Sequence, residues 1–383
     1  MKVLIVGAGI GGLTLAHVFE KGGIEYQIVE RSHNGDPERQ GFIIGLWSSG
    51  RRILQKIGLS EAFDEKSTPT HEATFARGNG QVIKRINYRP LESRDGAGLA
   101  CIKRADLYAI LSRGIPQGNI HYETTPTAIE QKGDVVSVTF SDGSTNAYDF
   151  VVGADGAKSW VRQQIFSDAI ITYTNWRVWC TWVPKKFETR NTISAYVEAK
   201  ELGVVVHTRD AAMAWLVTPT DHTSWDTEEG RVERLTKYFQ DITVFIPDAL
   251  AHAKDNEIPV SDFMEVSMKH LVRGRVALVG DAAHCLGPYT GFSSSMAMED
   301  AYVLGESLIL AQEGKLSIQK ALERYETLRV PRIEILRAIN NGIRSLVLSD
   351  SKLARACCNG IIRILPAAFI RSLAGIMTRW NIA

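Results

Sequence analysis

Residues 2–30, KVLIVGAGIGGLTLAHVFEKGGIEYQIVE, decide the fold of this chain. An apolar run at 2–6 is followed by a glycine cluster, a helix-like segment at 13–23 and a β-branched run that ends at Glu30. This order predicts strand, turn, helix and strand, which together make one βαβ unit. The unit predicts a Rossmann-like α/β fold with a parallel sheet.

The glycine cluster carries the chemical information of this unit. Gly7, Gly9 and Gly12 form the pattern G-x-G-x-x-G between a strand and a helix, which is the context that makes it specific. The glycines permit a tight turn, close approach of the backbone to a pyrophosphate, and close packing of helix on strand. The helix start, with Ile10 and Gly11, offers partial positive charge to the same phosphates.

Glu30 closes the second strand, where its carboxylate can accept hydrogen bonds from both hydroxyls of a ribose. This position favours an adenosine with a free 2′-hydroxyl, and the next residue, Arg31, is a further candidate contact. The motif alone does not separate NAD from FAD.

Composition excludes several classes of protein. With 383 residues, 45% of them hydrophobic and 23% charged, the chain is typical of a soluble globular protein of two or three domains. The net charge of +1 provides no global field for nucleic acid, so we expect no such partner. The five scattered cysteines form no C-x-x-C pair, which predicts no metal site and a reducing, cytoplasmic location. We expect no membrane-spanning helix, because no apolar stretch is long enough.

Two later segments each place a carboxylate at the end of a strand. They are DFVVGADGAKSWVR at 149–162, with Asp155, and GRVALVGDAAHCLGP at 274–288, with Asp281. Ligands of open α/β sheets lie at this edge, so Asp281 is placed to bind a sugar-like hydroxyl of an extended cofactor.

These motifs together carry a family resemblance. VGAGIGG at 6–12 with Glu30, GADG at 153–156 with Ser159 and Arg162, and GDAAH at 280–284 with Pro288 and Gly291 resemble the FAD-dependent aromatic hydroxylases of the para-hydroxybenzoate hydroxylase type. The resemblance reaches about residue 335, since YETLRVPR at 325–332 looks like that family's following helix.

The resemblance implies roles for individual residues. Glu30 would hold the adenosine ribose, Asp281 the ribityl chain, and Arg104 the FAD phosphates. The predicted FAD contacts are Gly7, Gly9, Ile10, Gly11, Gly12, Glu30, Arg31, Arg39, Arg104, Asp155, Asp281, Pro288, Gly291, Phe292, Ser293 and Ser294.

The fold that we expect is a Rossmann-like FAD-binding domain with an inserted antiparallel β-sheet substrate domain and C-terminal helices. The FAD-binding domain is discontinuous, over 1–70, 100–168 and 270–340. The substrate domain takes 71–99 and 169–269, where short strands rich in Val, Thr and Trp prevail, and 341–383 is a helical tail.

The segment from Gly291 to Ser295 precedes a long helical run that extends to about 340. We expect serines to cap this helix, and its free N–H groups to stabilise the anionic edge of a reduced flavin. Here the sequence departs from the family pattern, because Gly291-Phe292-Ser293 replaces the usual Gly-Gln-Gly. The approach of the backbone to the isoalloxazine is therefore differently shaped.

The resemblance implies that NAD(P)H reduces the flavin and that O₂ then forms a C4a-hydroperoxide, which hydroxylates or epoxidises a hydrophobic, aromatic small molecule. A pocket between flavin and sheet must exclude water. Its candidate residues are Trp176, Arg177, Trp179, His207, Trp215, Tyr289 and Phe292. Some of them also have a purely structural interpretation: core packing for Trp176 and Trp215, a satisfied or exposed strand residue for His207, and a solvated cation for Arg177.

Other functions stay open at this point. A flavin-dependent reductase of polyprenyl groups shares the glycine and GDAAH motifs, and a flavin-binding regulator would need no chemistry. A flavin halogenase is disfavoured, because the spacing of Trp179 and Trp182 before Pro184 is one residue too long for its W-x-W-x-I-P signature.

The tail from 351 to 383 combines five basic residues with apolar runs and has no acidic residue. It could lie on a membrane surface, cap the pocket, or dock on its own protein or on a second subunit. Both a monomer and a homodimer are compatible with the sequence.

Overall fold

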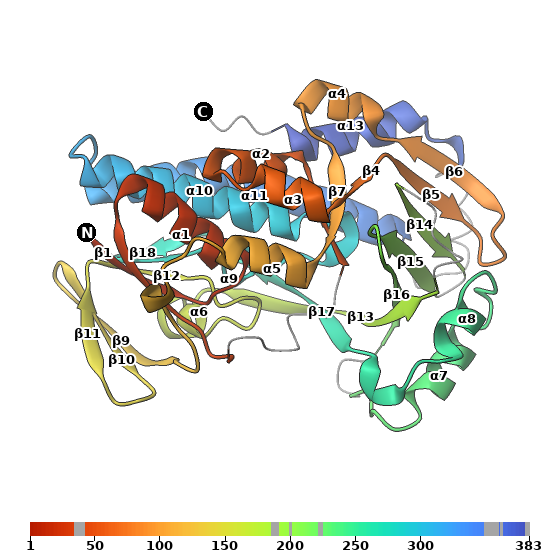
Figure 1. Ribbon diagram of the computed structural model, residues 1–383, viewed down its shortest axis with the longest axis horizontal. Helices are drawn as coiled ribbons and strands as arrows, with labels where there is room; N and C mark the ends of the chain where they lie inside the picture. The colour runs from red at the N-terminus through yellow and green to blue at the C-terminus, as the bar shows by residue number, and fades with distance from the viewer. Residues whose placement is uncertain are drawn as a thin grey trace.

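The structure is a computed structural model that describes residues 1–33, 43–184, 191–198, 201–220, 225–347, 360 and 363–379. Two layered units lie side by side in it (Figure 1), one built on a parallel sheet and the other on a larger, mostly antiparallel sheet.

The first sheet has the order β18-β19-β12-β1-β2-β8. Its strands are β18 (Val272–Arg273), β19 (Val276–Leu278), β12 (Phe150–Gly153), β1 (Lys2–Val6), β2 (Glu25–Val29) and β8 (Ile120–His121). All neighbours pair in parallel except β18 with β19. Strand β12 is apolar throughout, and β1 is apolar after Lys2, as expected of a sheet that is buried on both faces. Their carboxyl ends therefore meet at one edge.

Helices cover this sheet and cross above it (Figure 1). They are α1 (Ile10–Gly22), α2 (Ser48–Ile57), α3 (Ser60–Lys66), α5 (Arg104–Ser112), α10 (Ser293–Gln312) and α11 (Ile318–Val347). The single long helix expected up to about 340 is two helices, because the chain turns at Gly314 with φ +73°. Helices α2 and α3 were not predicted.

The second sheet has the order β17-β13-β16-β15-β14-β5-β6. Its strands are β17 (Val260–Ser267), β13 (Ile170–Val183), β16 (Ala212–Pro219), β15 (Leu202–His207), β14 (Thr192–Val197), β5 (Glu72–Ala76) and β6 (Val82–Asn87). Every pairing is antiparallel except β14 with β5, which joins the two separate chain segments. The predicted sheet is thus mixed at this one position.

The two faces of the second sheet have different neighbours. One face packs with Val205 and Ala214 against α7 (Arg231–Tyr238) and α8 (Ile246–Leu250). The other face, with Val206 and Met213, packs against the small sheet of β3 (Ile43–Leu46), β7 (Leu99–Lys103) and β4 (Thr68–Thr70). We call these the helix face and the inner face.

The remaining elements complete the fold. They are β9 (Pro126–Lys132), β10 (Val135–Phe140), β11 (Thr145–Tyr148), α4 (Arg89–Asp95), α6 (Trp160–Ile165), α9 (Asp281–His284), α13 (Ala367–Thr378) and the 3-10 turns η2 (Gln117–Asn119), η4 (Asp255–Glu257) and η5 (Pro288–Thr290). The expected fold class is confirmed, whereas its exact domain boundaries stay a prediction.

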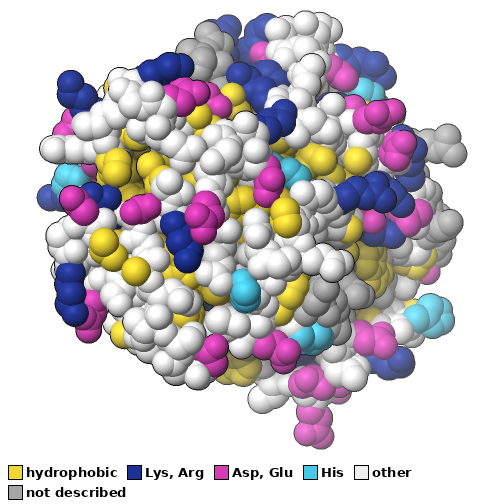
Figure 2. Space-filling view, turned by 60° about the vertical axis from the view of Figure 1, so that its left-hand side comes forward, with side chains coloured by type: hydrophobic (Ala, Val, Ile, Leu, Met, Phe, Trp, Pro, Cys, Tyr) yellow, Lys and Arg dark blue, Asp and Glu magenta, His cyan; other side chains and the backbone are white. Residues whose placement is uncertain are grey.

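On the face shown in Figure 2, Lys and Arg side chains are interspersed with Asp and Glu, so neither positive nor negative charge dominates this face. Among the helices that the structure describes, none is long and apolar enough to cross a membrane.

Candidate functional site

The candidate site lies at the carboxyl edge of the parallel sheet. Gly7 follows β1, Glu30 follows β2, Asp155 lies just after β12, and Asp281 lies just after β19. Parallel pairing therefore brings four predicted residues from distant parts of the chain to one edge.

The glycine turn leaves no space for side chains. Gly7 has φ +108°, and a Cβ placed on it would lie 2.5 Å from the carbonyl oxygen of Ala154. A Cβ on Gly12 would lie 2.1 Å from the carbonyl oxygen of Gly7. The backbone is thus held close to the sheet edge, and α1 starts at Ile10 with first-turn N–H groups that have no acceptor within the helix. An anion at this helix start would be stabilised.

Glu30 is fixed beside this turn. Its Oε2 accepts a hydrogen bond from the Ala8 N–H at 2.8 Å, and its Oε1 accepts one from the Ser32 N–H at 3.0 Å. The buried carboxylate is thus held beside the glycine turn at the end of β2. Arg31 next to it is exposed, and Arg39 lies outside the described residues.

Asp281 and Arg104 come together across the edge. Asp281 opens α9 after Gly280, whose φ is +62°, and Arg104 opens α5. Burial raises the pKa of Asp281, and the positive charges of His284, Arg104 and Arg162 only partly oppose this effect. Asp281 is therefore a buried carboxylate whose ionised form is stabilised chiefly by the charges of these neighbours.

Asp155 binds the first turn of α6, whose N-cap is Ser159. Its Oδ2 accepts hydrogen bonds from the N–H groups of Trp160 at 2.7 Å and Val161 at 3.0 Å. Its Oδ1 is buried and has no hydrogen-bond partner among the residues that the structure describes. Burial raises the pKa of Asp155, which the Ser159 hydroxyl and the capped N–H groups partly offset.

Arg162 links the two carboxylate-bearing motifs. It is buried and donates hydrogen bonds to the carbonyl oxygens of Ala282 at 2.8 Å and Ala157 at 2.6 Å. Ser159 holds the start of α6 by accepting from the Arg162 N–H at 2.9 Å. Both residues thus position the backbone that follows β12 against the backbone that follows β19.

A buried ionic network, which sequence reasoning missed, fixes α9 against α10 and α11. His284 hydrogen-bonds the Oδ2 of Asp300, and Arg329 donates to the Oδ1 of Asp300 at 2.7 Å. Arg329 and Arg332 also bind Glu299. Although burial acts to raise the pKa of Asp300, the charges of His284 and Arg329 lower it to about 2. Two arginines of the YETLRVPR segment therefore have a structural role.

The start of α10 differs from expectation. Its N-cap is Phe292, and no side chain caps it, so the prediction that serines cap this helix is wrong. Ser293 and Ser294 are its first helical residues, after Pro288 in η5 and Gly291 with φ +61°. Their first-turn N–H groups still lie where no acceptor exists within the helix.

Phe292 is 2% exposed and packs within the protein. Its ring lies 6.1 Å from that of Trp47 and 5.5 Å from the guanidinium of Arg332. Trp47 in turn donates its backbone N–H to Ser295 Oγ at 3.0 Å and its Nε1–H to the Thr290 carbonyl at 3.2 Å. Trp47, which no sequence motif marks, therefore fixes the loop before α10.

Three pocket candidates lie together. Trp176 shares an apolar cluster with Phe263, and Tyr289 packs against this cluster with its ring 5.6 Å from that of Phe263. The Tyr289 hydroxyl lies 3.2 Å from that of Thr174. Trp215 packs against the neighbouring cluster on the inner face. The inner face thus presents an aromatic, apolar wall.

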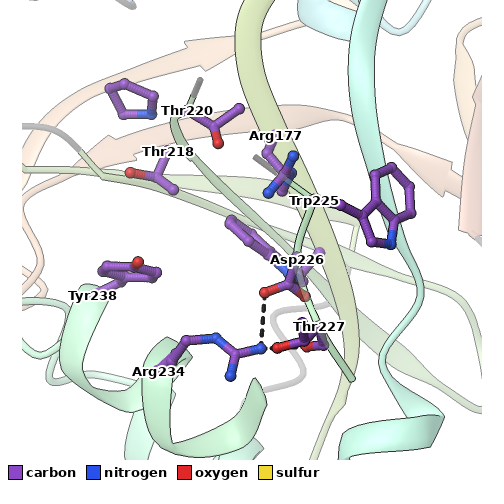
Figure 3. A pocket seen from close by; sticks show the side chains of 10 residues that line it. Arg177, Thr218, Thr220, Trp225, Asp226, Thr227, Arg234 and Tyr238 are labelled. Atoms are coloured by element: carbon purple, nitrogen blue, oxygen red, sulfur yellow. Dashed lines mark hydrogen bonds and ion pairs between the residues drawn. The ribbon is translucent and has the colours of Figure 1, made fainter. Parts of the chain in front are cut away.

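Three other candidates belong to the helix face. Arg177 is 4% exposed and forms an ion pair with Asp262, and its guanidinium lies 5.7 Å from the ring of Trp225. With Trp179, Arg177 lines a cavity of about 300 Å³ toward α7 (Figure 3). His207 alternates with Val206 on β15 and therefore points to the helix face, where it is buried.

The arrangement can bind an elongated ligand that carries phosphates and hydroxyl groups along the sheet edge. A flat ring at its far end would face the apolar wall. Among the residues that the structure describes, no group of three or more His, Cys, Asp or Glu could hold a metal ion.

Comparisons with known proteins agree with this geometry. A family model described as FAD binding domain matches residues 1–338. The chain is 29% identical over 386 residues to 2-heptyl-3-hydroxy-4(1H)-quinolone synthase of Pseudomonas aeruginosa, covering 97% of this chain and 96% of that protein. It is 28% identical over 351 residues to an FAD-dependent urate hydroxylase of Mycolicibacterium vanbaalenii, covering 88% and 87%.

Among solved structures, HpxO of Klebsiella pneumoniae in complex with FAD and uric acid is similar with a TM-score of 0.90. Its sequence is 22% identical, and the match covers 99% of this chain and 97% of that one. At this identity the likeness supports the fold.

Proposed function

This chain belongs to the FAD binding domain family and is an FAD-dependent monooxygenase, and we propose that it consumes NAD(P)H and O₂ to hydroxylate or epoxidise a hydrophobic, aromatic small molecule through a flavin C4a-hydroperoxide. The observation that carries the proposal is that Tyr289 in η5, shortly after Asp281 in the chain, packs against the aromatic cluster of the inner face.

The residues at the sheet edge fit FAD. The N–H groups at the start of α1 suit phosphate, the Glu30 carboxylate suits a ribose, and Asp281 with Arg104 suits the ribityl and phosphate groups. The buried Oδ1 of Asp155 remains for a further donor. When bound, FAD supplies the electron transfer and oxygen activation that amino-acid side chains do not provide.

The protein's own contribution is to bind, orient and exclude water. Trp176, Trp215 and Tyr289 would form the wall of the substrate pocket, and their rings would keep the reacting edge of the substrate dry. The Tyr289 and Thr174 hydroxyls are the polar pair in this wall that could orient a substrate oxygen or nitrogen.

The names of two relatives support a ring-shaped substrate, since one names a quinolone and the other urate. We propose no direct contact of His207 or Arg177 with the substrate, because both side chains belong to the helix face. The flavin-dependent reductase that the sequence left open has no specific observation in its favour, and it is an outcome of the test below.

The test is to reduce the FAD-loaded protein anaerobically with NADH or NADPH, mix it with oxygenated buffer, and follow the flavin spectrum. We expect a transient absorbance band that is distinct from those of reduced and oxidised flavin. Its lifetime should be longer in the presence of an aromatic compound, drawn from a panel of candidates, that becomes hydroxylated. Trp215→Ala should raise the share of NAD(P)H electrons that appear as hydrogen peroxide. Direct reoxidation throughout, with reduction of a prenylated substrate, would establish the reductase instead.

A further inference from the structure

Helix α13 is anchored by one face to the rest of the protein. It packs against β6 and α4, and its buried side includes Ala374, Gly375 and Met377. Figure 1 shows this helix beside α4 at the edge of the second sheet. The docked face of the tail helix is therefore already occupied.

Basic side chains hold the segment before this helix and its C-terminal end. Lys84 donates to the Arg363 carbonyl, before the helix begins, at 3.1 Å. In the last turn, Arg52 donates to the Thr378 carbonyl at 3.1 Å, and Arg332 donates to the Ile376 carbonyl at 3.1 Å. Because the last carbonyls of a helix carry partial negative charge, these contacts fix its orientation. The opposite face is thus presented rigidly.

The opposite face is apolar and exposed. Phe369 is 50% exposed and Ile376 is 43% exposed, and with Ala368 and Ser372 they follow the spacing of one helical stripe. Ile364, just before the helix, is 82% exposed. No charged residue interrupts this stripe, so it is a surface that water solvates poorly.

The surroundings of the stripe are basic. Arg363 and Arg379 flank the helix and are exposed, and the chain from 351 to 383 contains no Asp or Glu. On the neighbouring β6, the side chain of Arg85 is 65% exposed and lies 3.8 Å from the carboxylate of Glu72. The acidic residues of α4 are already paired, Glu92 with His71 and Asp95 with Arg94.

We propose that this face of α13 binds the surface of a bilayer that contains anionic lipids. Apolar side chains between flanking cations are the pattern that places a helix in the plane of the headgroups. A second copy fits less well, because a two-fold contact over the stripe would bring Arg363 and Arg379 against their own charges. Since α13 packs on β6, the bilayer would lie next to the sheet that carries the aromatic inner face.

The experiment is co-sedimentation of the full-length, FAD-loaded protein with vesicles. One set contains phosphatidylcholine alone and the other contains phosphatidylcholine with phosphatidylglycerol. We expect enrichment on the anionic vesicles that falls with added salt. Phe369→Ser with Ile376→Ser should weaken the binding by about tenfold, and Arg363→Gln with Arg379→Gln should remove the preference for anionic lipid.

The matched control is Val135→Ser, which changes a side chain of similar exposure on β10 in the other unit. It should bind vesicles like the wild type, and retained FAD absorbance shows that every variant is folded. Equal sedimentation of wild type and the Phe369 variant overturns the proposal. So does a dimer in light scattering that only the Phe369 change dissociates. None of these readouts depends on turnover, so the proposed oxidation stands or falls separately.

Discussion

His284 hydrogen-bonds the carboxylate of Asp300, and neither side chain is more than 2% exposed. The bond joins the GDAAH turn, which bears Asp281, to the helix that begins beside the predicted flavin edge. A histidine in a conspicuous motif thus has a positioning role, and its imidazole is committed to a carboxylate rather than to substrate.

Acid should test this bond first. The pKa of Asp300 is lowered from 3.8 to about 2 by His284 and Arg329 against the effect of burial. Because the pKa of Asp300 is lower in the folded than in the unfolded protein, its ionised form stabilises the fold at pH values above the unfolded pKa, here by about 2 kcal/mol. This stabilisation is lost as the pH falls from 3.8 toward 2. Asp300→Asn should lower stability at neutral pH and flatten the acid limb of urea unfolding.

The control for Asp300 is Asp64→Asn, which removes a largely exposed partner of Arg51. We expect this change to alter stability by less than about 1 kcal/mol. An Asp300→Asn protein with the acid limb of the wild type would contradict the role given to the network.

Asp281→Asn should have opposite effects on the protein without and with FAD. Because burial raises the pKa of Asp281, its ionised form costs stability at pH values above the unfolded pKa. Asparagine removes this cost, so the melting temperature of the FAD-free protein should rise at neutral pH. The affinity for FAD should fall by about tenfold as the proposed contacts of Asp281 with the ribityl chain weaken. A parallel fall of both quantities would show that Asp281 is merely structural.

Glu30→Gln should weaken FAD binding by about 10 to 100-fold, since hydrogen bonds to a charged group are worth about 1.5–3 kcal/mol. The quench of flavin fluorescence on titration gives the dissociation constant. The control is Glu25→Gln, which changes an exposed carboxylate at the beginning of β2, the strand that Glu30 follows. Identical constants for the two variants would remove Glu30 from the cofactor site.

Arg177→Gln should cost about 3–5 kcal/mol of unfolding free energy, because it leaves the carboxylate of Asp262 buried without its cation. FAD affinity and the yield of oxidised product should stay unchanged, since Arg177 lies on the helix face. The double change with Asp262→Asn should restore part of the stability. A stable Arg177→Gln enzyme with a raised KM would place the arginine at the substrate after all.

Much of the cofactor edge was predictable because its signals are local. Gly7 and Gly12 need backbone space that only glycine leaves, and Glu30 and Asp281 directly follow apolar strands that can be recognised in the sequence. Short-range patterns of this kind can be recognised in the sequence without knowledge of the tertiary fold.

The rest depends on contacts between distant segments. Trp47 and Asp300 are important only through partners far along the chain, and no spacing rule connects them. The strand pattern around Arg177 marked it as a candidate, but which sheet face meets the first unit is set by packing, not by alternation. The expected serine cap failed because α10 begins at Ser293, which puts Phe292 at the N-cap position.

The parallel pairing of β14 with β5 also governs when this protein can fold. During synthesis, β5 and β6 leave the ribosome long before their neighbour β14 has been made. The interval is even longer for β1, because its sheet is complete only after β19 has been made. Both units must therefore close late and almost together, with a high contact order and exposed strand edges in the interval. Synthesis at low temperature or with abundant chaperone should accordingly raise the soluble yield more than any stabilising change at the surface.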